Sequence, residues 1–258
     1  MNTSIPFRVR PMLATLVREP FDQEGWVYEE KYEGYRILAY KEGDHVVLMS
    51  RNAIDRTESF PGIAATVQGL APSTLLLDGE VVAFDRKRVS RFQLIQRGKV
   101  EHVYAVFDCL YTNGKDLRGE PLFARRTALE KCVDSSKVLM PSRRLSANGL
   151  EAYRMAKKKG YEGVVGKDSS SHYLEMRSSL WLKVKVHQED EFIIAGFTKP
   201  SGSRKYFGAL LLGAYDQGKL KCEGKVGTGF DEETLASLHR KFAPLVHAKR
   251  PSLFWCPS

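Results

Sequence analysis

Short runs rich in β-branched and aromatic residues restrict the fold of this 258-residue chain more than any other feature. Such runs are typical of strands. Helical patterns lie between them. Asn148 and Glu151 form a capping-box pattern and Gly160 stands where a helix would end, which predicts a helix from Gly149 to Lys159. The other expected elements are helices at 60–70 and 125–133, and strands at Trp26–Glu30, Ile37–Lys41, Val46–Ser50, Leu75–Phe84, Val103–Leu110, Gly163–Lys167 and Leu182–Val186.

The pattern changes after His187. Three runs, at 190–198, 209–215 and 219–226, predict consecutive antiparallel strands, and a helix is expected from Asp231 to about Phe242. Several short strands followed by one helix favour a small β-barrel. We therefore expect an α+β protein with a first domain at 1–187 and a second at 188–258.

Composition limits the class of protein. There are 40 Lys and Arg against 31 Asp and Glu, and the net charge of +9 favours polyanion partners such as nucleic acid. Apolar runs such as Ala209–Leu212 are too short to span a bilayer, and residues 1–14 lack a signal-peptide core. We therefore expect a cytoplasmic protein without membrane association. Four scattered cysteines argue against a zinc ribbon and a disulfide framework, and favour reduced thiols.

Lys31 is the candidate nucleophile. It lies between two strand-like runs and shortly before Gly34. A free lysine has a pKa of about 10.4, and burial or neighbouring cations lower that value until the amine is reactive. Attack on the α-phosphorus of a nucleotide would then give a lysyl phosphoramidate. A solvated lysine at a strand end is the alternative interpretation of this segment taken alone.

Two carboxylates and two lysines complete a set suited to phosphate chemistry. Glu80 and Glu162 each flank a glycine at a strand end, and Mg²⁺ favours one or two carboxylates together with phosphate oxygens. Lys183 and Lys185 are two residues apart on a strand and so share a face, where an anion between them would offset their repulsion. Ordinary turn acids and a lysine-protected strand edge are the alternatives.

Phe107 ends an apolar run, where an aromatic ring can stack on a base or pack into the core. The segment Gly160–Asp168 has the wrong spacing for a Walker A loop, and the lone GxG at 227–229 lacks a βαβ context. Nucleotide binding by this chain would therefore be of neither the P-loop nor the Rossmann type.

In their order along the chain these segments resemble the motifs of the covalent nucleotidyltransferases, which comprise DNA ligases, RNA ligases and mRNA capping enzymes. The segments are KYEGYR at 31–36, SRN at 50–52, DGE at 78–80, FD at 107–108, EGVVGK at 162–167 and WLKVK at 181–185. Five further segments resemble the ATP-dependent DNA ligases of bacterial non-homologous end joining, the ligase D type. They are PMLAT at 11–15, FDQEGW at 21–26, RFQ at 91–93, GALLLGAYD at 208–216 and GKVGTGFD at 224–231.

The resemblance implies an adenylation (nucleotidyltransferase, ATP-grasp-like) domain at 1–187 and an OB-fold at 188–258. Lys31 would carry AMP, while Lys183 and Lys185 would contact the α-phosphate. Phe107 would stack on the adenine, with Glu29 beside it.

The remaining roles implied by the resemblance concern the ribose, the metal and DNA. Glu162, helped by Glu80, would hold Mg²⁺ or Mn²⁺. The residues near the ribose would be Arg36, Arg51 and Glu80. Arg204 and Lys205, in a loop of the second domain, are expected to contact the DNA backbone.

The function implied is that of an ATP-dependent DNA ligase that seals nicks or broken ends of double-stranded DNA through lysyl-AMP and a DNA-adenylate. Such a ligase would act in DNA repair and recombination as a monomer in the bacterial cytoplasm, associated with the nucleoid and with end-joining proteins. An RNA ligase or guanylyltransferase relative, or a degenerate homologue that binds nicks without catalysis, are the alternatives.

Two departures from the family pattern stand out. Glu33 occupies a position where the family's nucleophile motif has Asp, which keeps the charge and changes its reach. The basic–acidic motif that follows the last helix in the family is missing, since only the segment Lys249-Arg250-Pro251, with two basic residues and no acid, follows that helix. We therefore expect either that the second domain is truncated or that the chain self-adenylates weakly, and a missing final strand would leave an open edge.

Overall fold

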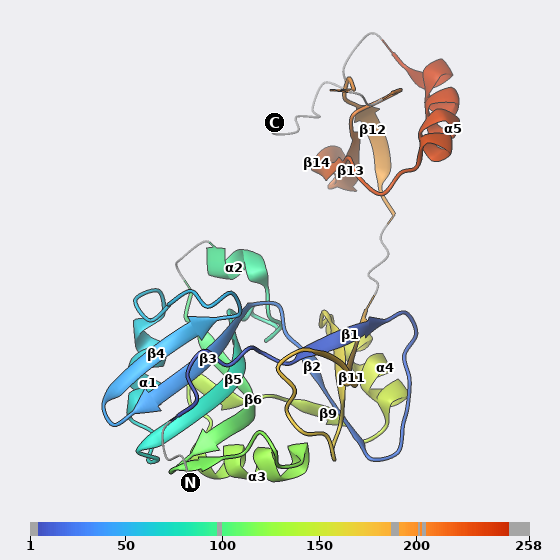
Figure 1. The fold of residues 1–258 in the computed structure, drawn as a ribbon. Coiled ribbons are helices and arrows are strands. Elements are labelled where there is room, and N and C mark those ends of the chain that lie inside the picture. The colour runs from blue at the N-terminus through green and yellow to red at the C-terminus, as the bar shows by residue number, and fades with distance from the viewer. Residues whose placement is uncertain (1–4, 97–99, 187–190, 201, 203–204, 248–258) are drawn as a thin grey trace. The chain divides into compact units, whose positions relative to one another are not determined.

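The structure is a computed structural model that describes residues 5–96, 100–186, 191–200, 202 and 205–247. The chain divides into two compact units, Met1–His187 and Gln188–Ser258. Each unit mixes helices and strands, which confirms the α+β class (Figure 1). Among the described residues, no helix has both the length and the apolar character needed to cross a membrane.

Two sheets form the first unit (Figure 1). The first sheet has the order β1-β11-β10-β2-β9 and the second the order β4-β3-β5-β6-β7, with β8 parallel to β6. The strands of the first sheet are β1 Leu13–Val17, β2 Trp26–Lys31, β9 Arg144–Ser146, β10 Gly163–Asp168 and β11 Arg177–Lys185. The strands of the second are β3 Tyr35–Glu42, β4 His45–Ser50, β5 Thr74–Val82, β6 Val103–Thr112, β7 Lys115–Asp116 and β8 Leu139–Pro141.

Helices cover the outer faces of both sheets. Helices α1 (Pro61–Gln68) and α3 (Leu122–Cys132) pack on the second sheet, where Ile63, Val67 and Leu129 join its outward-facing side chains. Helix α4 (Gly149–Lys159) covers the first sheet. The short helix α2 (Phe92–Gln96) follows β5. The unit is thus layered, and one face of each sheet is left for the other sheet.

Alternation along the strands builds the layer between the two sheets. In β3, Ile37 packs toward the helices, whereas Leu38 joins a cluster with Phe107 of the same sheet and Trp181 of the opposite sheet. A residue period of two sends successive side chains to opposite faces, so a single strand serves both layers. The candidate site lies along this inter-sheet layer.

The sequence-predicted helix at 149–159 is confirmed at both ends. Asn148 accepts a hydrogen bond from the backbone N–H of Glu151 at 2.9 Å, and Gly160 ends the helix at φ +74°. Glu151 does not complete a capping box, because its carboxylate accepts from the Ser146 hydroxyl at 2.5 Å. The other predicted strands and helices of this unit are also confirmed, whereas β1, β7, β8, β9 and α2 were not predicted.

The second unit contains one antiparallel sheet in the order β12-β13-β14. The elements are β12 Ile193–Phe197, β13 Leu210–Asp216, β14 Lys219–Val226, α5 Glu232–Phe242 and a 3₁₀ turn, η1, at Ala243–Leu245. Phe207, Leu210 and Leu235 form its small core. The described strands make an open sheet and not a closed barrel. One expectation is wrong: Cys222 is disulfide-bonded, so the cysteines are not all reduced thiols.

Candidate active site

The register of the first sheet brings the candidate residues together. Gly163 on β10 pairs with Lys31 on β2 and with Lys185 on β11, and Val165 pairs with Glu29 and with Lys183. Residues two apart on a strand share a face, so these rows point to the same side of the sheet. The residues of this face that line a pocket of about 210 Å³ are Glu29, Lys31, Val165, Lys167, Trp181 and Lys183.

The second sheet supplies the opposite wall. Arg36 on β3 pairs with Glu80 on β5, and both line the pocket. Phe107 also lines it, from a β-bulge: Asp78 pairs with Asp108 and Gly79 with Val106, so Phe107 has no partner across the ladder. The extra residue turns the Phe107 ring into the inter-sheet layer, while Val106 packs on the other face.

Two glycines of the candidate motifs allow the backbones to approach closely. A β-carbon on Gly34 would lie 2.1 Å from the Val81 carbonyl oxygen, and one on Gly79 would lie 2.6 Å from both the Ala105 carbonyl oxygen and the Tyr104 ring. Any side chain at these positions would push β3 or β5 away. The glycines therefore fix the wall that carries Arg36 and Glu80.

Lys31 lies among carboxylates and further lysines. Its ammonium donates a hydrogen bond to Glu162 Oε2, and Lys185 Nζ is 3.5 Å from Glu162 Oε1. Burial, followed by the charges of Lys31 and two other cations, lowers the pKa of Lys183. Burial also raises the pKa of Glu80 to about 7, against the opposing effects of Arg36 and Lys31. This end of the pocket collects positive charge, as a phosphate site requires.

The other end of the pocket is closed. Lys167 is 2% exposed, and its ammonium lies 2.7 Å from Glu29 Oε2 and 4.4 Å from the ring centres of both Phe107 and Trp181. Burial raises the pKa of Glu29, but Lys167 and Arg126 outweigh it and hold the pKa below its ordinary value. An ionised carboxylate and two aromatic rings thus form the floor of the pocket.

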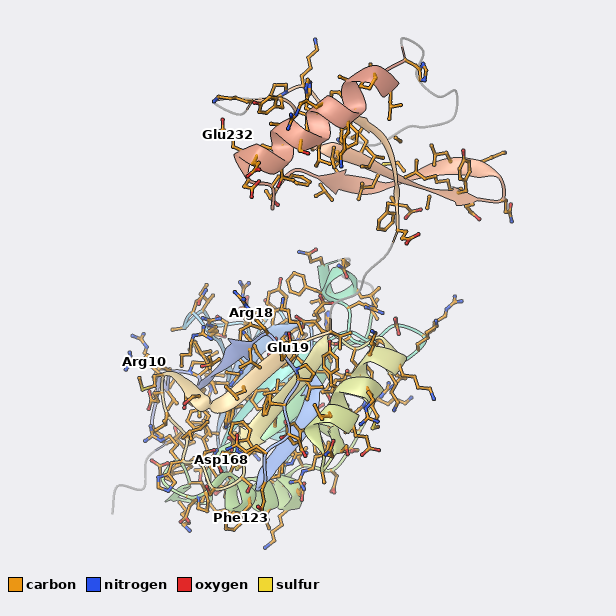
Figure 2. The ribbon with its side chains drawn as sticks, turned by 90° about the vertical axis from the view of Figure 1, so that its right-hand side faces the viewer. Arg10, Arg18, Glu19, Phe123, Asp168 and Glu232 are labelled. Atoms are coloured by element: carbon orange, nitrogen blue, oxygen red, sulfur yellow. The ribbon has the colours of Figure 1, made fainter. Side chains whose placement is uncertain are left out.

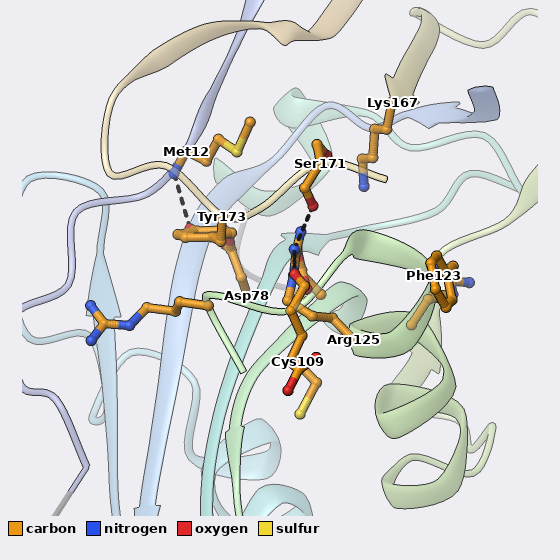
Figure 3. Close-up of polar contacts among 12 residues, drawn as sticks. Met12, Asp78, Cys109, Phe123, Arg125, Lys167, Ser171 and Tyr173 are labelled. Atoms are coloured by element: carbon orange, nitrogen blue, oxygen red, sulfur yellow. Dashed lines mark hydrogen bonds and ion pairs between the residues drawn. The ribbon is translucent and has the colours of Figure 1, made fainter. Parts of the chain in front are cut away.

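Two ion pairs hold the second wall in place. Arg36 binds Asp78 through two hydrogen bonds of 2.5 and 2.6 Å, and its guanidinium lies 4.4 Å from the Phe107 ring centre. The Tyr173 hydroxyl donates to Asp78 at 2.6 Å and accepts from the backbone N–H of Met12 at 2.9 Å (Figure 3). These bonds link β3, β5, Tyr173 and the residue before β1 into one network.

The second pair joins Arg125 of α3 to Asp108. Its two hydrogen bonds measure 2.8 and 2.9 Å, and Arg125 also donates to the Ser171 carbonyl oxygen at 2.8 Å (Figure 3). Both side chains are fully buried. The first turn of α3 and the residues after β10 also meet at the surface, where the Phe123 N–H donates to the Ser169 carbonyl oxygen. Phe123 and the nearby Asp168 lie at the same edge of the unit (Figure 2).

The sequence-predicted residues fall into three groups. The pocket lining includes Glu29, Lys31, Arg36, Arg51, Glu80, Phe107 and Lys183. Glu162 and Lys185 lie beside Lys31 but outside that lining, and the Lys185 side chain is 53% exposed. Lys205, in the second unit, is exposed and pairs with Glu232 at 2.6 Å, while Arg204 lies outside the described residues.

Sequence reasoning gave no role to Lys167 and Arg177, which also line the pocket, nor to Arg126 and Ser142, which bind Glu29 from behind. Strand alternation could have identified Lys167, since it lies two residues beyond Val165. In the described part of the chain no three His, Cys, Asp or Glu side chains gather as a metal site. The arrangement suits a nucleotide, with its base at the closed end and its phosphates near Lys31.

Family models match most of the chain. The ATP dependent DNA ligase domain matches residues 11–185, and the ATP dependent DNA ligase C terminal region matches residues 203–257. A multifunctional non-homologous end joining protein, LigD, of Pseudomonas aeruginosa is 38% identical over 97% of this chain. A DNA ligase of Thermococcus fumicolans is 33% identical over 92%. The chain spans 31% of the length of the first and 48% of the second.

Solved structures agree in fold. A mycobacterial DNA ligase D complexed with ATP and MES is 30% identical, with a TM-score of 0.66, and the match covers 98% of this chain and 84% of that one. The ligase domain of LigD from M. tuberculosis gives the same TM-score and coverage at 32% identity. Both the sequence and the fold of this chain are therefore similar to those of a single group of enzymes.

Proposed function

This chain belongs to the family of ATP-dependent DNA ligases, and from that premise we propose that it uses ATP to seal nicks or broken ends in double-stranded DNA. The observation that carries the proposal is the position of Lys31. Its amine lies against Glu162, beside a pocket that also presents Glu80 and Lys183. Lys31, Glu80 and Lys183 come from three different strands.

The first chemical step is adenylation of Lys31. Its ammonium gives up a proton toward Glu162, to which it is hydrogen-bonded, and the amine attacks the α-phosphorus of ATP. A P–N bond forms, the bond between the α-phosphorus and the bridging oxygen breaks, and pyrophosphate leaves. Lys183, whose pKa is lowered first by burial and then by Lys31, faces the same space and stabilises the charge on the α-phosphate.

Two further steps complete sealing. A 5′-phosphate oxygen at the break attacks the same phosphorus, which releases Lys31 and leaves AMP on the DNA end. The adjacent 3′-hydroxyl then attacks the 5′-phosphorus, the new phosphodiester forms, and AMP leaves. Each step exchanges one bond to phosphorus for another, so the pocket need only hold the phosphate and neutralise charge.

Adenine would occupy the closed end of the pocket. Phe107 and Trp181 offer aromatic surface there, and Glu29 offers a hydrogen-bond acceptor. Arg36 and Arg51 line the pocket and would lie near the ribose. These assignments place the base beside Glu29 at the closed end and the phosphates beside Lys31 at the other end, with the ribose between them.

Glu80 and Glu162 fit a divalent cation. Mg²⁺ takes one or two carboxylates with phosphate oxygens and water, so two carboxylates suffice here. Burial and the proximity of Asp78 and Glu162 raise the pKa of Glu80, and a cation would reverse that effect. Bound Mg²⁺ or Mn²⁺ would offset the charge on the departing pyrophosphate.

The two units would divide the work. We assign adenylation to residues 1–187 and an OB-fold role in DNA contact to 188–258, where Lys205 is an exposed cation. The net charge of +9 suits a duplex partner, and binding should weaken steeply with salt. End-joining proteins as partners, a monomeric state and action at the bacterial nucleoid remain part of the proposal.

The test is incubation with ATP labelled at the α-phosphate, with Mg²⁺ or Mn²⁺, followed by a denaturing gel. We expect a covalent label on the wild type and on Lys115→Ala, an exposed lysine away from the pocket, and none on Lys31→Ala. No label on the wild type under any condition, or equal label on Lys31→Ala, would contradict the proposal. Sealing of a pre-adenylated nick tests the last step independently.

A further inference from the structure

Glu29 is held from behind by two residues that do not line the pocket. Arg126 Nη1 donates to Glu29 Oε1 at 3.0 Å, and the Ser142 hydroxyl donates to Glu29 Oε2 at 2.9 Å. Arg126 is 4% exposed and Ser142 3%, so both bonds are shielded from water. Shielded hydrogen bonds to a charged group are stronger and more restrictive than exposed ones.

Arg126 and Ser142 also bind each other. Arg126 donates to the Ser142 hydroxyl at 2.6 Å and to its carbonyl oxygen at 2.7 Å. The backbone N–H of Ser142 donates to the Val106 carbonyl at 2.6 Å, one residue before the bulge at Phe107. Helix α3, the segment after β8 and strand β6 thus converge on one carboxylate of the opposite sheet.

The Glu29 carboxylate has an acceptor position left for a ligand. A carboxylate has about four acceptor positions, two on each oxygen. Oε2 receives Ser142 and Lys167, whereas Oε1 receives only Arg126 among the described residues. One acceptor position on Oε1 is therefore open, on a side chain that lines the pocket. An N–H of a ligand can fill it, and a carbonyl oxygen cannot.

We propose that Arg126 and Ser142 are positioning residues for base selection, which hold Glu29 as an acceptor whose Oε1 receives the 6-amino group of adenine. This inference rests on the proposed use of ATP. A 6-oxo purine would place an oxygen against the carboxylate, and the repulsion would exclude it. Glu29 keeps its charge because Lys167 and Arg126 outweigh the effect of burial on its pKa.

The experiment compares the binding of ATP with that of inosine triphosphate, which carries oxygen in place of the 6-amino group. Titration calorimetry on the full chain with Lys31→Ala measures binding without covalent transfer. We expect ATP to bind on the order of tenfold more tightly, as one hydrogen bond to a charged group predicts. Adding Arg126→Met should bring the ratio close to one, and adding Ser142→Ala should reduce it by about threefold.

A change in pH separates positioning from simple destabilisation. Without Arg126 the pKa of Glu29 should rise, and a protonated Glu29 can donate to a 6-oxo group, so the ratio in Arg126→Met should fall further as pH is lowered from 8 to 6. Arg126→Lys keeps the positive charge and should restore most of the preference for ATP. Arg118→Met is the matched control, because Arg118 forms ion pairs with Asp116 and Glu175 away from the pocket.

Three results would overturn the inference. One is a ratio unchanged at every pH in Arg126→Met and Ser142→Ala, with thermal melting showing that they are folded. Another is a ratio near one in the Lys31→Ala reference, and the third is a reference that binds neither nucleotide. Should Arg126→Met not fold, Ser142→Ala decides. The proposed function is read separately, from the Lys31 adduct in the wild type, so either can fail while the other stands.

Discussion

The two ends of the pocket solve opposite problems with the same residue types. At the closed end, Lys167 and Glu29 are 2% and 3% exposed and are surrounded by aromatic rings and further hydrogen bonds. At the open end, the side chains of Lys31 and Glu162 are 16% and 19% exposed, and water can reach both. Each end contains a lysine–carboxylate pair. Glu29 and Lys31 are two residues apart on β2, whereas Glu162 directly precedes β10, which carries Lys167.

This difference in exposure determines which of the two ion pairs can react. A fully buried ion pair is fixed by its neighbours, and moving either partner leaves an unpaired charge in a dry environment. A partly exposed pair can separate at smaller cost, because water replaces the lost partner. The closed end is therefore suited to recognition of a base. The open end is suited to chemistry, in which Lys31 must leave Glu162 and form a new bond.

The largest effect on stability is expected from a substitution at the closed end of the pocket. Lys167→Met removes the ammonium and leaves Glu29 with Arg126 as its single cationic partner. We expect a loss of about 3 to 5 kcal/mol in the free energy of unfolding, as for other buried pairs deprived of one partner. Urea denaturation followed by circular dichroism measures it.

Lys31→Met is the matched substitution at the open end. It removes the Lys31 partner of Glu162, which is partly exposed and which Lys185 can still approach. The expected loss in the free energy of unfolding is therefore below about 1 kcal/mol. Adenylation should nevertheless disappear. Equal destabilisation by the two substitutions would mean that the ends do not differ in the way proposed.

A second prediction concerns the pH dependence of the free energy of unfolding. Glu80 has its pKa raised to about 7, mainly by burial, against an ordinary value of 4.5. Between these values the unfolded chain ionises Glu80 while the folded chain keeps it protonated, so unfolding releases a proton. Glu80 alone should therefore lower the stability by on the order of 3 kcal/mol as pH rises from about 4.5 to about 7, and its contribution should change little above that.

Glu80→Gln tests the source of this decline. Glutamine cannot ionise, so the fall in the free energy of unfolding between pH 4.5 and 7 should be reduced to about half. A residual slope is expected from Glu30, whose pKa is also raised to about 7 by burial. A wild type and a Glu80→Gln variant with parallel pH profiles would show that Glu80 does not titrate in this range.

A third prediction ranks the two lysines of β11. Lys183 lines the pocket, whereas Lys185 is 53% exposed and lies 3.5 Å from Glu162, its one ion-pair partner among the described residues. We expect Lys183→Ala to slow adenylation by on the order of 100-fold, as for the loss of one donor to a developing oxyanion. Lys185→Ala should slow it by less than about tenfold, since an exposed charge is screened. Single-turnover labelling with ATP measures both rates, and equal losses would contradict the ranking.

Residues at the open end could be predicted from the sequence because their motifs are short. Lys31, Glu80 and Lys183 each lie within a few residues of a glycine or a second charge on one strand, and strand alternation places them. The alternation also places Trp181 with Lys183 and Lys185 on one face of β11, which the sequence alone did not make clear. Local pattern was sufficient where one strand determines the direction of a side chain.

Residues at the closed end could not be predicted in this way. Arg126 and Ser142 lie 97 and 113 residues from Glu29 along the chain, and their contacts depend on how α3 docks on the second sheet. The bulge at Phe107 shifts the alternation of β6 by one residue, and an apolar run gives no sign of where that shift falls. Tertiary packing, which no single segment encodes, determines this end.

The smallest effect is expected in the second unit, on the salt dependence of DNA binding. Lys205 and Lys221 are matched exposed lysines, each paired with one carboxylate, Glu232 and Asp216 respectively. Neither substitution to Ala should change thermal stability measurably, because exposed pairs contribute little. If Lys205 contacts a DNA phosphate, Lys205→Ala should reduce the slope of log Kd against log salt by about 0.9, whereas Lys221→Ala should leave it unchanged. Fluorescence anisotropy with a nicked duplex at four salt concentrations measures the slopes, and equal slopes for the two variants would remove Lys205 from the proposed DNA contact.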